Sequence, residues 1–94
     1  MAYALAFANT AIEDLNRLVD SLPSSRQDEA VDEIERVVLA FADRPVHRRG
    51  RTGSPPSFPI HFRASGTLYY WTGTYRLSED ETTLIITHLF RTGL

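Results

Sequence analysis

Residues 57–71 read SFPIHFRASGTLYYW and decide how this 94-residue chain folds. From residue 57 to residue 64, aromatic and branched apolar side chains stand at every second position, which is typical of a strand with one buried face. Ser65-Gly66 predicts a tight turn, and the aromatic and β-branched run Thr67–Leu77 predicts a second strand paired with the first. Because Pro59 cannot donate a ladder hydrogen bond, we expect the first of these strands at a sheet edge.

Two further strands are predicted outside this hairpin. Ser78–Glu81 is a polar turn, and Thr83–Phe90 is apolar on both faces, which suits a strand in the interior of a sheet. At the other end of the chain, Tyr3–Phe7 alternates aromatic and branched residues with alanine and predicts the first strand.

Two amphipathic helices are predicted between the first and second strands. A capping box of Thr10 with Glu13 begins the first helix, and a proline ends it. The second helix begins at Ser24 or Ser25. The apolar stripes expected to face the core are Ile12, Leu15, Val19 and Leu22 on the first helix and Val31, Ile34, Val38 and Phe41 on the second.

The predicted element order is therefore βααβββ within a single domain over residues 1–94. We expect an α+β fold, with the N-terminal strand and an αα-hairpin packed on one face of a small, mostly antiparallel four-stranded sheet.

Charge is distributed unevenly along the chain, whose net charge is −2. Residues 1–43 hold nine acids and three bases, whereas residues 44–94 hold seven arginines and three acids. All ten basic residues are arginine, and no cysteine is present, so a disulfide framework and a cysteine-based zinc site are excluded. The separation of charge predicts one surface for an anionic partner, while the acidic total argues against a general nucleic-acid coat protein.

No run of apolar residues approaches the length of a membrane span, so no membrane association is expected. The first residues carry no basic stretch before an apolar run and no convincing cleavage site, so we expect no signal peptide. A cytoplasmic protein is the resulting expectation.

The element order and several phrases resemble the RelE/ParE superfamily of toxins from bacterial type II toxin–antitoxin pairs. The resemblance covers nearly the whole chain: a Tyr-led first strand, an acidic helical hairpin ending in FADRP (41–45), a basic loop, the hairpin FPIHFRASGTLYYW and the final strand IITHLFR. Arg63 matches the first arginine of the family's usual hairpin phrase. The second arginine is missing, which puts nuclease activity in doubt.

The resemblance implies one of two activities. RelE-like members bind the ribosome and cut mRNA, whereas ParE-like members inhibit DNA gyrase and have no nuclease chemistry. Both are neutralised by a cognate antitoxin protein. RNA cleavage needs a base for the 2′-hydroxyl, cations for the phosphate and a proton for the leaving oxygen. No cofactor is expected, and no metal, since the three histidines show no ligand spacing.

The predicted catalytic residues are His61, Arg63 and His88. His61 and Arg63 project together from the polar side of their strand, although both are also ordinary surface residues for such a position. His88 falls where family members often carry a histidine. Strand alternation instead groups it with Leu84 and Ile86, so a core-facing, hydrogen-bonded His88 stays open as the alternative.

The residues predicted to contact RNA or a protein partner are Arg44, Arg48, Arg49, Arg51, Tyr69, Trp71 and Arg91. The loop arginines suit phosphates, or else form a solvated loop. Tyr69 and Trp71 share a strand face, where they either stack on bases or pack across strands.

Two classes of function remain open. The catalytic set favours a RelE-like endoribonuclease, whereas the missing arginine and a pI of about 5.8 favour a ParE-like or inactive relative that acts only by protein contact. An unrelated α+β interaction domain with the same element order is the third alternative.

Overall fold

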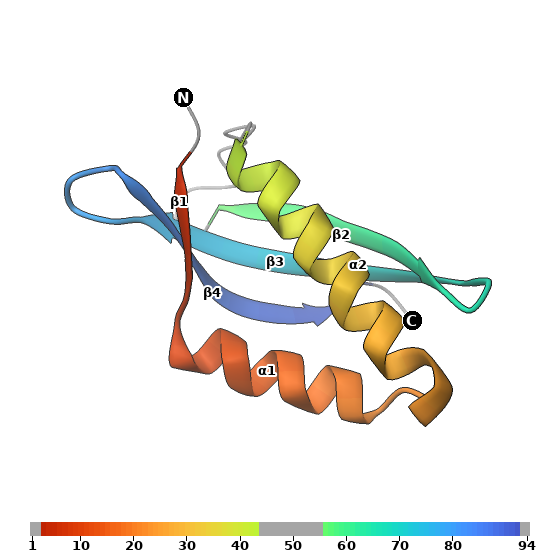
Figure 1. The fold of residues 1–94 in the computed structure, drawn as a ribbon. Helices are drawn as coiled ribbons and strands as arrows, with labels where there is room; N and C mark the ends of the chain where they lie inside the picture. Colours follow the sequence, from red (N-terminus) through yellow and green to blue (C-terminus); the bar gives the residue numbers. More distant parts are fainter. Residues whose placement is uncertain (1–2, 44–55, 93–94) are drawn as a thin grey trace.

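The computed structural model describes residues 3–43 and 56–92 and has the predicted order βααβββ. Its elements are β1 (Ala4–Phe7), α1 (Asn9–Asp20), α2 (Ser24–Asp43), β2 (Ser57–Ala64), β3 (Thr67–Leu77) and β4 (Thr83–Arg91). Figure 1 shows the two helices in front of a curled sheet. The predicted α+β class is confirmed.

The four strands form one sheet in the order β1-β4-β3-β2. β1 runs parallel to β4, and the other two pairings are antiparallel. The N-terminal strand is thus itself an edge of the sheet. β4 is interior, as its two apolar faces predict. β2 is the other edge strand, and there the missing N–H of Pro59 costs no hydrogen bond to a strand on its outer side.

A two-residue turn joins β2 to β3. Ser65 and Gly66 both have positive φ, 49° and 80°, which is the type I′ geometry that matches the twist of a hairpin. The carboxylate of Glu29 on α2 accepts a hydrogen bond of 2.5 Å from the backbone N–H of Ser65. The helix therefore holds the hairpin at its turn.

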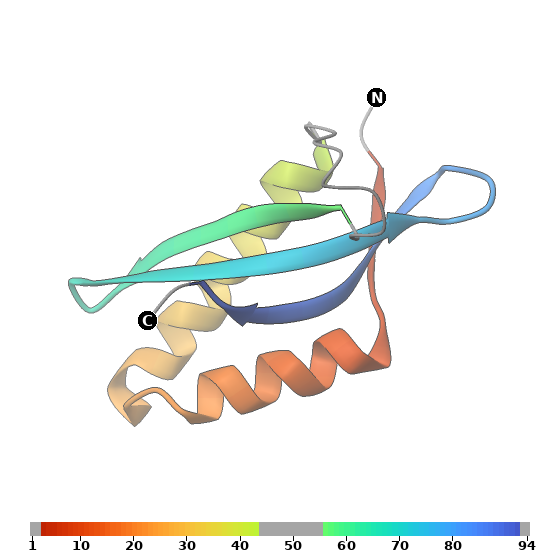
Figure 2. The same ribbon diagram turned by 180° about the vertical axis from the view of Figure 1, so that it is seen from behind.

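Both helices cover the same side of the sheet, which we call the helix face. α1 packs on β4 and α2 packs on β2, and the helices diverge from their connection (Figure 1). Every second residue of β2 is buried against α2. The opposite side, which we call the open face, carries no helix among the described residues (Figure 2).

The predicted start of the first helix is wrong. α1 begins at Asn9, its N-cap is Ala8, and no side chain caps it. Thr10 lies inside the helix, and its hydroxyl donates a 2.6 Å hydrogen bond to the carbonyl of Thr87 on β4. The residue that local pattern assigns to a capping box therefore serves a contact with a distant strand.

The helices are also rotated relative to the predicted apolar stripes. The small residues Ala11 and Ala30 are fully buried, whereas Ile12 and Val31 are 44% and 39% exposed. Small side chains let the helix axes lie close to the sheet. The predicted core is confirmed at Val19, Leu22, Ile34 and Val38.

We expect Gly73→Ala to destabilise the fold. A Cβ at Gly73 would lie 2.9 Å from the ring of Phe58. That ring is 3% exposed and stacks on Phe41 at 4.0 Å, so it has little room to move. The expected loss is about 1–3 kcal/mol of unfolding free energy, measured by urea denaturation.

The matched test is the double variant Phe58→Leu/Gly73→Ala. Leucine removes the clashing ring atoms, so the double variant should be more stable than the sum of the two single effects. Strict additivity, or a wild-type stability for Gly73→Ala, would contradict the packing described.

Candidate functional site

The open face is an exposed surface that combines aromatic, histidine and arginine side chains. On this side lie His61 and Arg63 of β2, Leu68, Tyr70 and Thr72 of β3, and His88 and Phe90 of β4, together with Thr74, which is buried. Leu68, Tyr70 and Phe90 are 42%, 50% and 45% exposed. Large apolar side chains grouped on one uncovered face are typical of a binding surface.

A β-bulge in β4 decides which residues of that strand reach the open face. Thr74 pairs with His88 and Tyr75 pairs with Ile86, so Thr87 is the extra residue. Before the bulge Leu84 and Ile86 are buried, and after it Leu89 is buried in place of residue 88. His88 and Phe90 are thereby turned outward.

α1 binds the backbone of the bulge at two points. The hydroxyl of Thr10 donates to the carbonyl of Thr87, and the backbone N–H of Leu89 donates to Asp14 Oδ2 at 3.1 Å. A bulge interrupts the regular ladder, and its polar backbone groups need other partners. The two side chains of α1 supply those partners.

The carboxylate of Asp14 is the centre of a small polar cluster. Besides Leu89, His88 Nδ1 lies 3.3 Å from Oδ2, and Arg17 Nη2 donates to Oδ1 at 2.9 Å. Partial burial by itself would raise the pKa of Asp14. The hydrogen bonds from Leu89, His88 and Arg17, with the charge of Arg17, outweigh that effect and lower the pKa below 3.8.

The same contact orients the imidazole of His88. With Nδ1 directed at a carboxylate, the neutral ring carries its proton on Nδ1 and leaves Nε2 as a free acceptor. The side chain of His88 is 58% exposed. The core-facing alternative for His88 is therefore wrong, because the bulge reverses the alternation on which it depended.

His61 and Arg63 lie together on β2, near Tyr70. The rings of His61 and Tyr70 meet edge to face with centroids 4.8 Å apart. Arg63 is exposed and makes no ion pair with any described residue. An imidazole, a free guanidinium and an exposed aromatic ring thus occupy one patch, which we call the His61 patch (His61, Arg63 and Tyr70).

The predicted catalytic set is divided between two places. His61 pairs with Tyr70 and His88 pairs with Thr74, four residues farther along β3. This register separates the two histidines by about 13 Å along the strands and about 10 Å across them. They lie on one face but cannot both contact a single phosphate.

The predicted aromatic pair faces the helices. Trp71 is 1% exposed and packs edge to face on Phe62 at 4.9 Å, so the expectation that its ring stacks on bases is wrong. Tyr69 is partly buried, stacks on Phe62 at 5.2 Å, and accepts a 3.0 Å hydrogen bond from Arg26. Cross-strand packing is therefore the observed arrangement.

Two residues of this site are outside the predicted set of site residues. Tyr70 is the exposed aromatic, and its pairing opposite His61 was the signal that could have identified it. Asp14 gave no signal, because its role depends on a bulge that the sequence does not mark. Arg91 is exposed, as expected. The predicted loop contacts Arg44, Arg48, Arg49 and Arg51 lie outside the described residues.

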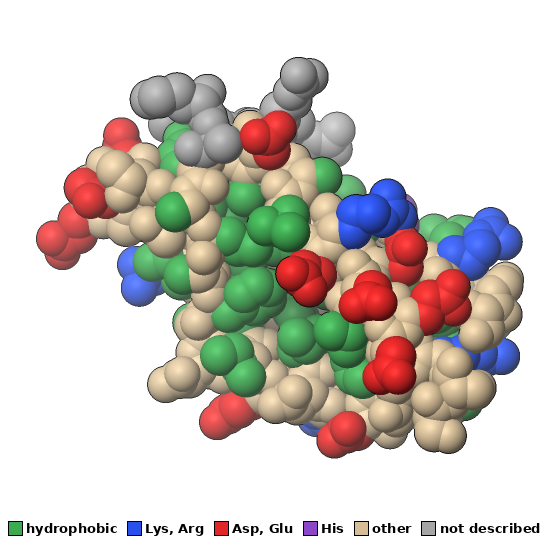
Figure 3. Space-filling view, viewed as in Figure 1, with side chains coloured by type: hydrophobic (Ala, Val, Ile, Leu, Met, Phe, Trp, Pro, Cys, Tyr) green, Lys and Arg blue, Asp and Glu red, His purple; other side chains and the backbone are tan. Residues whose placement is uncertain are grey.

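A second apolar surface lies on the other side of the molecule. Side chains from β1, α1 and α2 line a groove of about 250 Å³, and its lining residues are Leu5, Phe7, Leu15, Val31, Ile34, Glu35 and Leu39. Figure 3 shows apolar side chains gathered between the two helices, with acidic side chains on the surrounding surface. This groove is distinct from the open face.

Within residues 3–43 and 56–92, three or more side chains of the types that ligate metals are nowhere grouped closely enough to hold an ion. Neither α1 nor α2 is both long and apolar enough to cross a membrane.

The fold is that of the RelE toxins. The chain aligns with the toxin–antitoxin complex RelBE2 of Mycobacterium tuberculosis at 18% identity and TM-score 0.58, covering 98% of this chain and 100% of that one. It aligns with the isolated Escherichia coli RelE toxin at 16% identity and TM-score 0.54, covering 99% and 87%. The intact E. coli RelBE complex aligns at 16% identity and TM-score 0.51, covering 99% and 100%.

No protein-family model and no curated protein sequence matches the chain. The likeness is therefore one of structure, over the full length of the chain.

We expect Asp14→Ala to lower the unfolding free energy by about 1–3 kcal/mol at neutral pH, because the N–H of Leu89 loses a charged acceptor. Since folding lowers the pKa of Asp14 below 3.8, its contribution is complete above that value and is lost as the pH falls through the folded-state pKa. The difference between wild type and variant should therefore shrink on acidification.

Urea denaturation from neutral pH to pH 3 measures this difference. Glu13→Ala is the matched control, since Glu13 is exposed and precedes Asp14 on α1. Equal effects of the two substitutions at neutral pH would rule out the role assigned to Asp14.

Proposed function

We propose that the chain is the growth-inhibiting toxin of a type II toxin–antitoxin pair and acts as a RelE-like, ribosome-dependent mRNA endoribonuclease. The observation that carries this proposal is the structural match to RelE toxins over 97–99% of the chain. The open face supports it, because it offers an imidazole and a guanidinium that has no ion-pair partner among residues 3–43 and 56–92.

The His61 patch suits RNA cleavage without a metal. In the proposed reaction His61 removes the proton of a 2′-hydroxyl, whose oxygen attacks the neighbouring phosphorus to form a 2′,3′-cyclic phosphate. The bond to the 5′-oxygen breaks in the same step, and that oxygen takes a proton from water. Arg63 stabilises the negative charge that develops on the phosphate oxygens. Tyr70, half exposed beside His61, stacks on a base and positions the strand.

His88 has a different place in this proposal. The distance between His88 and His61, along and across the strands, is greater than the length of one nucleotide. His88 therefore contacts a neighbouring nucleotide rather than the reacting phosphate. The hydrogen bond to Asp14 leaves Nε2 free to accept from a ribose hydroxyl or a base.

The second candidate function is binding without catalysis, as in gyrase inhibition. The scarcity of positive charge favours it: among the described residues of β2, β3 and β4 the arginines are Arg63, Arg76 and Arg91. The exposed Leu68, Tyr70 and Phe90 suit a protein partner as well as RNA.

A cognate antitoxin is the proposed partner in either case. Two of the similar structures are toxin–antitoxin complexes. The apolar side chains of the open face and of the groove between α1 and α2 are surfaces that an antitoxin would cover. Ribosomes and gyrase both place the site of action in the cytoplasm.

We expect induction of the chain in a bacterium to stop translation within minutes and to produce cut mRNA. His61→Ala and Arg63→Ala should each reduce cleavage by about 10²-fold or more, since each removes a group that acts on the reacting phosphate. His88→Ala should reduce it by less than about tenfold. Cleavage is measured by mapping mRNA 5′ ends after induction.

Arg76→Ala is the control for loss of an exposed arginine on β3, and circular dichroism checks that each variant folds. Induction of the DNA-damage response with intact mRNA would replace the nuclease proposal by gyrase inhibition. Unimpaired growth at confirmed expression would reject both toxin activities.

A further inference from the structure

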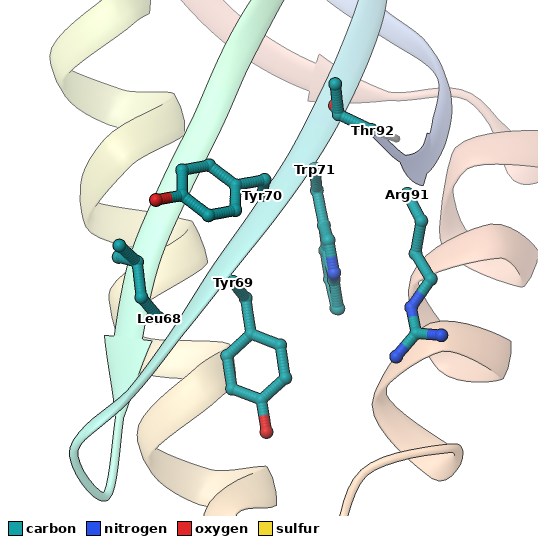
Figure 4. A pocket seen from close by; sticks show the side chains of 6 residues that line it. All are labelled: Leu68, Tyr69, Tyr70, Trp71, Arg91 and Thr92. Carbon is teal, nitrogen blue, oxygen red and sulfur yellow. The ribbon is translucent and has the colours of Figure 1, made fainter. Parts of the chain in front are cut away.

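A small pocket next to the His61 patch, with which it shares Tyr70, lies where β4 ends beside β3. Its volume is about 250 Å³, and its lining residues are Leu68, Tyr69, Tyr70, Trp71, Arg91 and Thr92. Figure 4 shows Tyr69, Trp71 and Arg91 projecting from the strands in the same direction. None of the steps proposed for RNA cleavage uses Trp71 or Arg91.

The indole of Trp71 brings an unsatisfied donor to this pocket. Its Nε1 atom is buried and has no hydrogen-bond partner. Among the described residues, no other buried side-chain nitrogen or oxygen lacks one. A buried N–H without an acceptor costs about 1–3 kcal/mol, so its retention is a reason to look for an acceptor supplied from outside.

Arg91 brings an unpaired cation to the same place. It is exposed and makes no hydrogen bond or ion pair with any described residue. Arg91 and Trp71 are directly paired across β4 and β3, so their side chains project from the same side of the sheet. The guanidinium of Arg91 and the indole of Trp71 therefore lie on the same side of the sheet, at one pocket.

The remaining walls restrict what can enter. Tyr69 is held in place by its hydrogen bond from Arg26 and by stacking on Phe62, and it forms a rigid aromatic wall. The pocket thus presents one positive charge, an N–H donor and aromatic flanks. A carboxylate on a short apolar stem matches these three features, because it is planar, has one negative charge and has two oxygen acceptors. A guanidinium binds such a group through parallel N–H donors.

We propose that this pocket, with Arg91 and Trp71 Nε1 as donors, is a carboxylate-binding subsite that accepts an acidic side chain of a polypeptide partner. One carboxylate oxygen accepts from the exposed Arg91 guanidinium. The other accepts from the indole N–H, which is buried in the free chain and becomes accessible as the carboxylate enters. The subsite stands on the geometry alone. Its occupant in the cell rests on the proposed function, in which the polypeptide partner is the antitoxin.

The chain contains a single tryptophan, so one indole resonance in a ¹H–¹⁵N spectrum reports directly on the pocket. The probes are a blocked pentapeptide with one glutamate among alanines, its glutamine twin, and inorganic phosphate at equal ionic strength. We expect the glutamate peptide to shift the indole resonance downfield saturably and the glutamine twin to leave it in place. In Arg91→Gln the affinity for the glutamate peptide should fall at least tenfold.

Arg76→Gln removes another exposed arginine of the sheet and should bind the glutamate peptide as wild type does. An indole resonance that does not move, or moves equally with both peptides, would overturn the proposal. A shift with phosphate alone would overturn it in favour of a nucleic-acid backbone contact. These spectra need no growth inhibition or mRNA cleavage, so failure here is distinguishable from failure of the proposed function.

Discussion

The carboxylate of Asp14 on α1 stabilises the β-bulge in β4. This bulge determines which residues of β4 lie on the helix face and which lie on the open face. The Asp14 carboxylate accepts the backbone N–H of Leu89, while the hydroxyl of Thr10 on the same helix binds the carbonyl of Thr87. Together these contacts satisfy backbone groups at the bulge. The bulge then keeps Leu89 in the core and turns His88 toward the open face. The position of one helix therefore sets which residues of the central strand can reach a partner.

This arrangement separates stability from function on the sheet. The helix face is filled by large apolar side chains and closely approaching small ones, as at Gly73 beneath the ring of Phe58. Side chains on the open face need not pack closely, so histidine, arginine and exposed aromatic residues lie there with little loss of stability. A RelE-like fold at 16–18% identity is consistent with this division, because a core tolerates much substitution when its pattern is kept.

Short-range pattern was enough to predict the element order, the edge position of β2 and the interior position of β4. Each depends on alternation, turn residues or proline, and these act within a few positions. The predictions that were wrong involve long-range contacts. Residues 9–13 favour a local cap at Thr10, because nothing in them indicates the carbonyl of Thr87, which is distant in sequence. No residue type marks the bulge, so the sequence leaves the orientation of His88 open. It also leaves open whether Trp71 stacks on bases or packs across strands, because the contacts of its ring on the helix face are long-range.

The RNA cleavage proposed for the open face depends on His61 and Arg63. Its most direct test is a reconstitution of the purified chain with programmed ribosomes and a defined mRNA, in parallel with Arg63→Ala and Arg76→Ala. We expect cleavage of the mRNA by wild type and by Arg76→Ala, and little or none by Arg63→Ala. Intact mRNA with the wild-type chain, or equal cleavage by all three proteins, would contradict it.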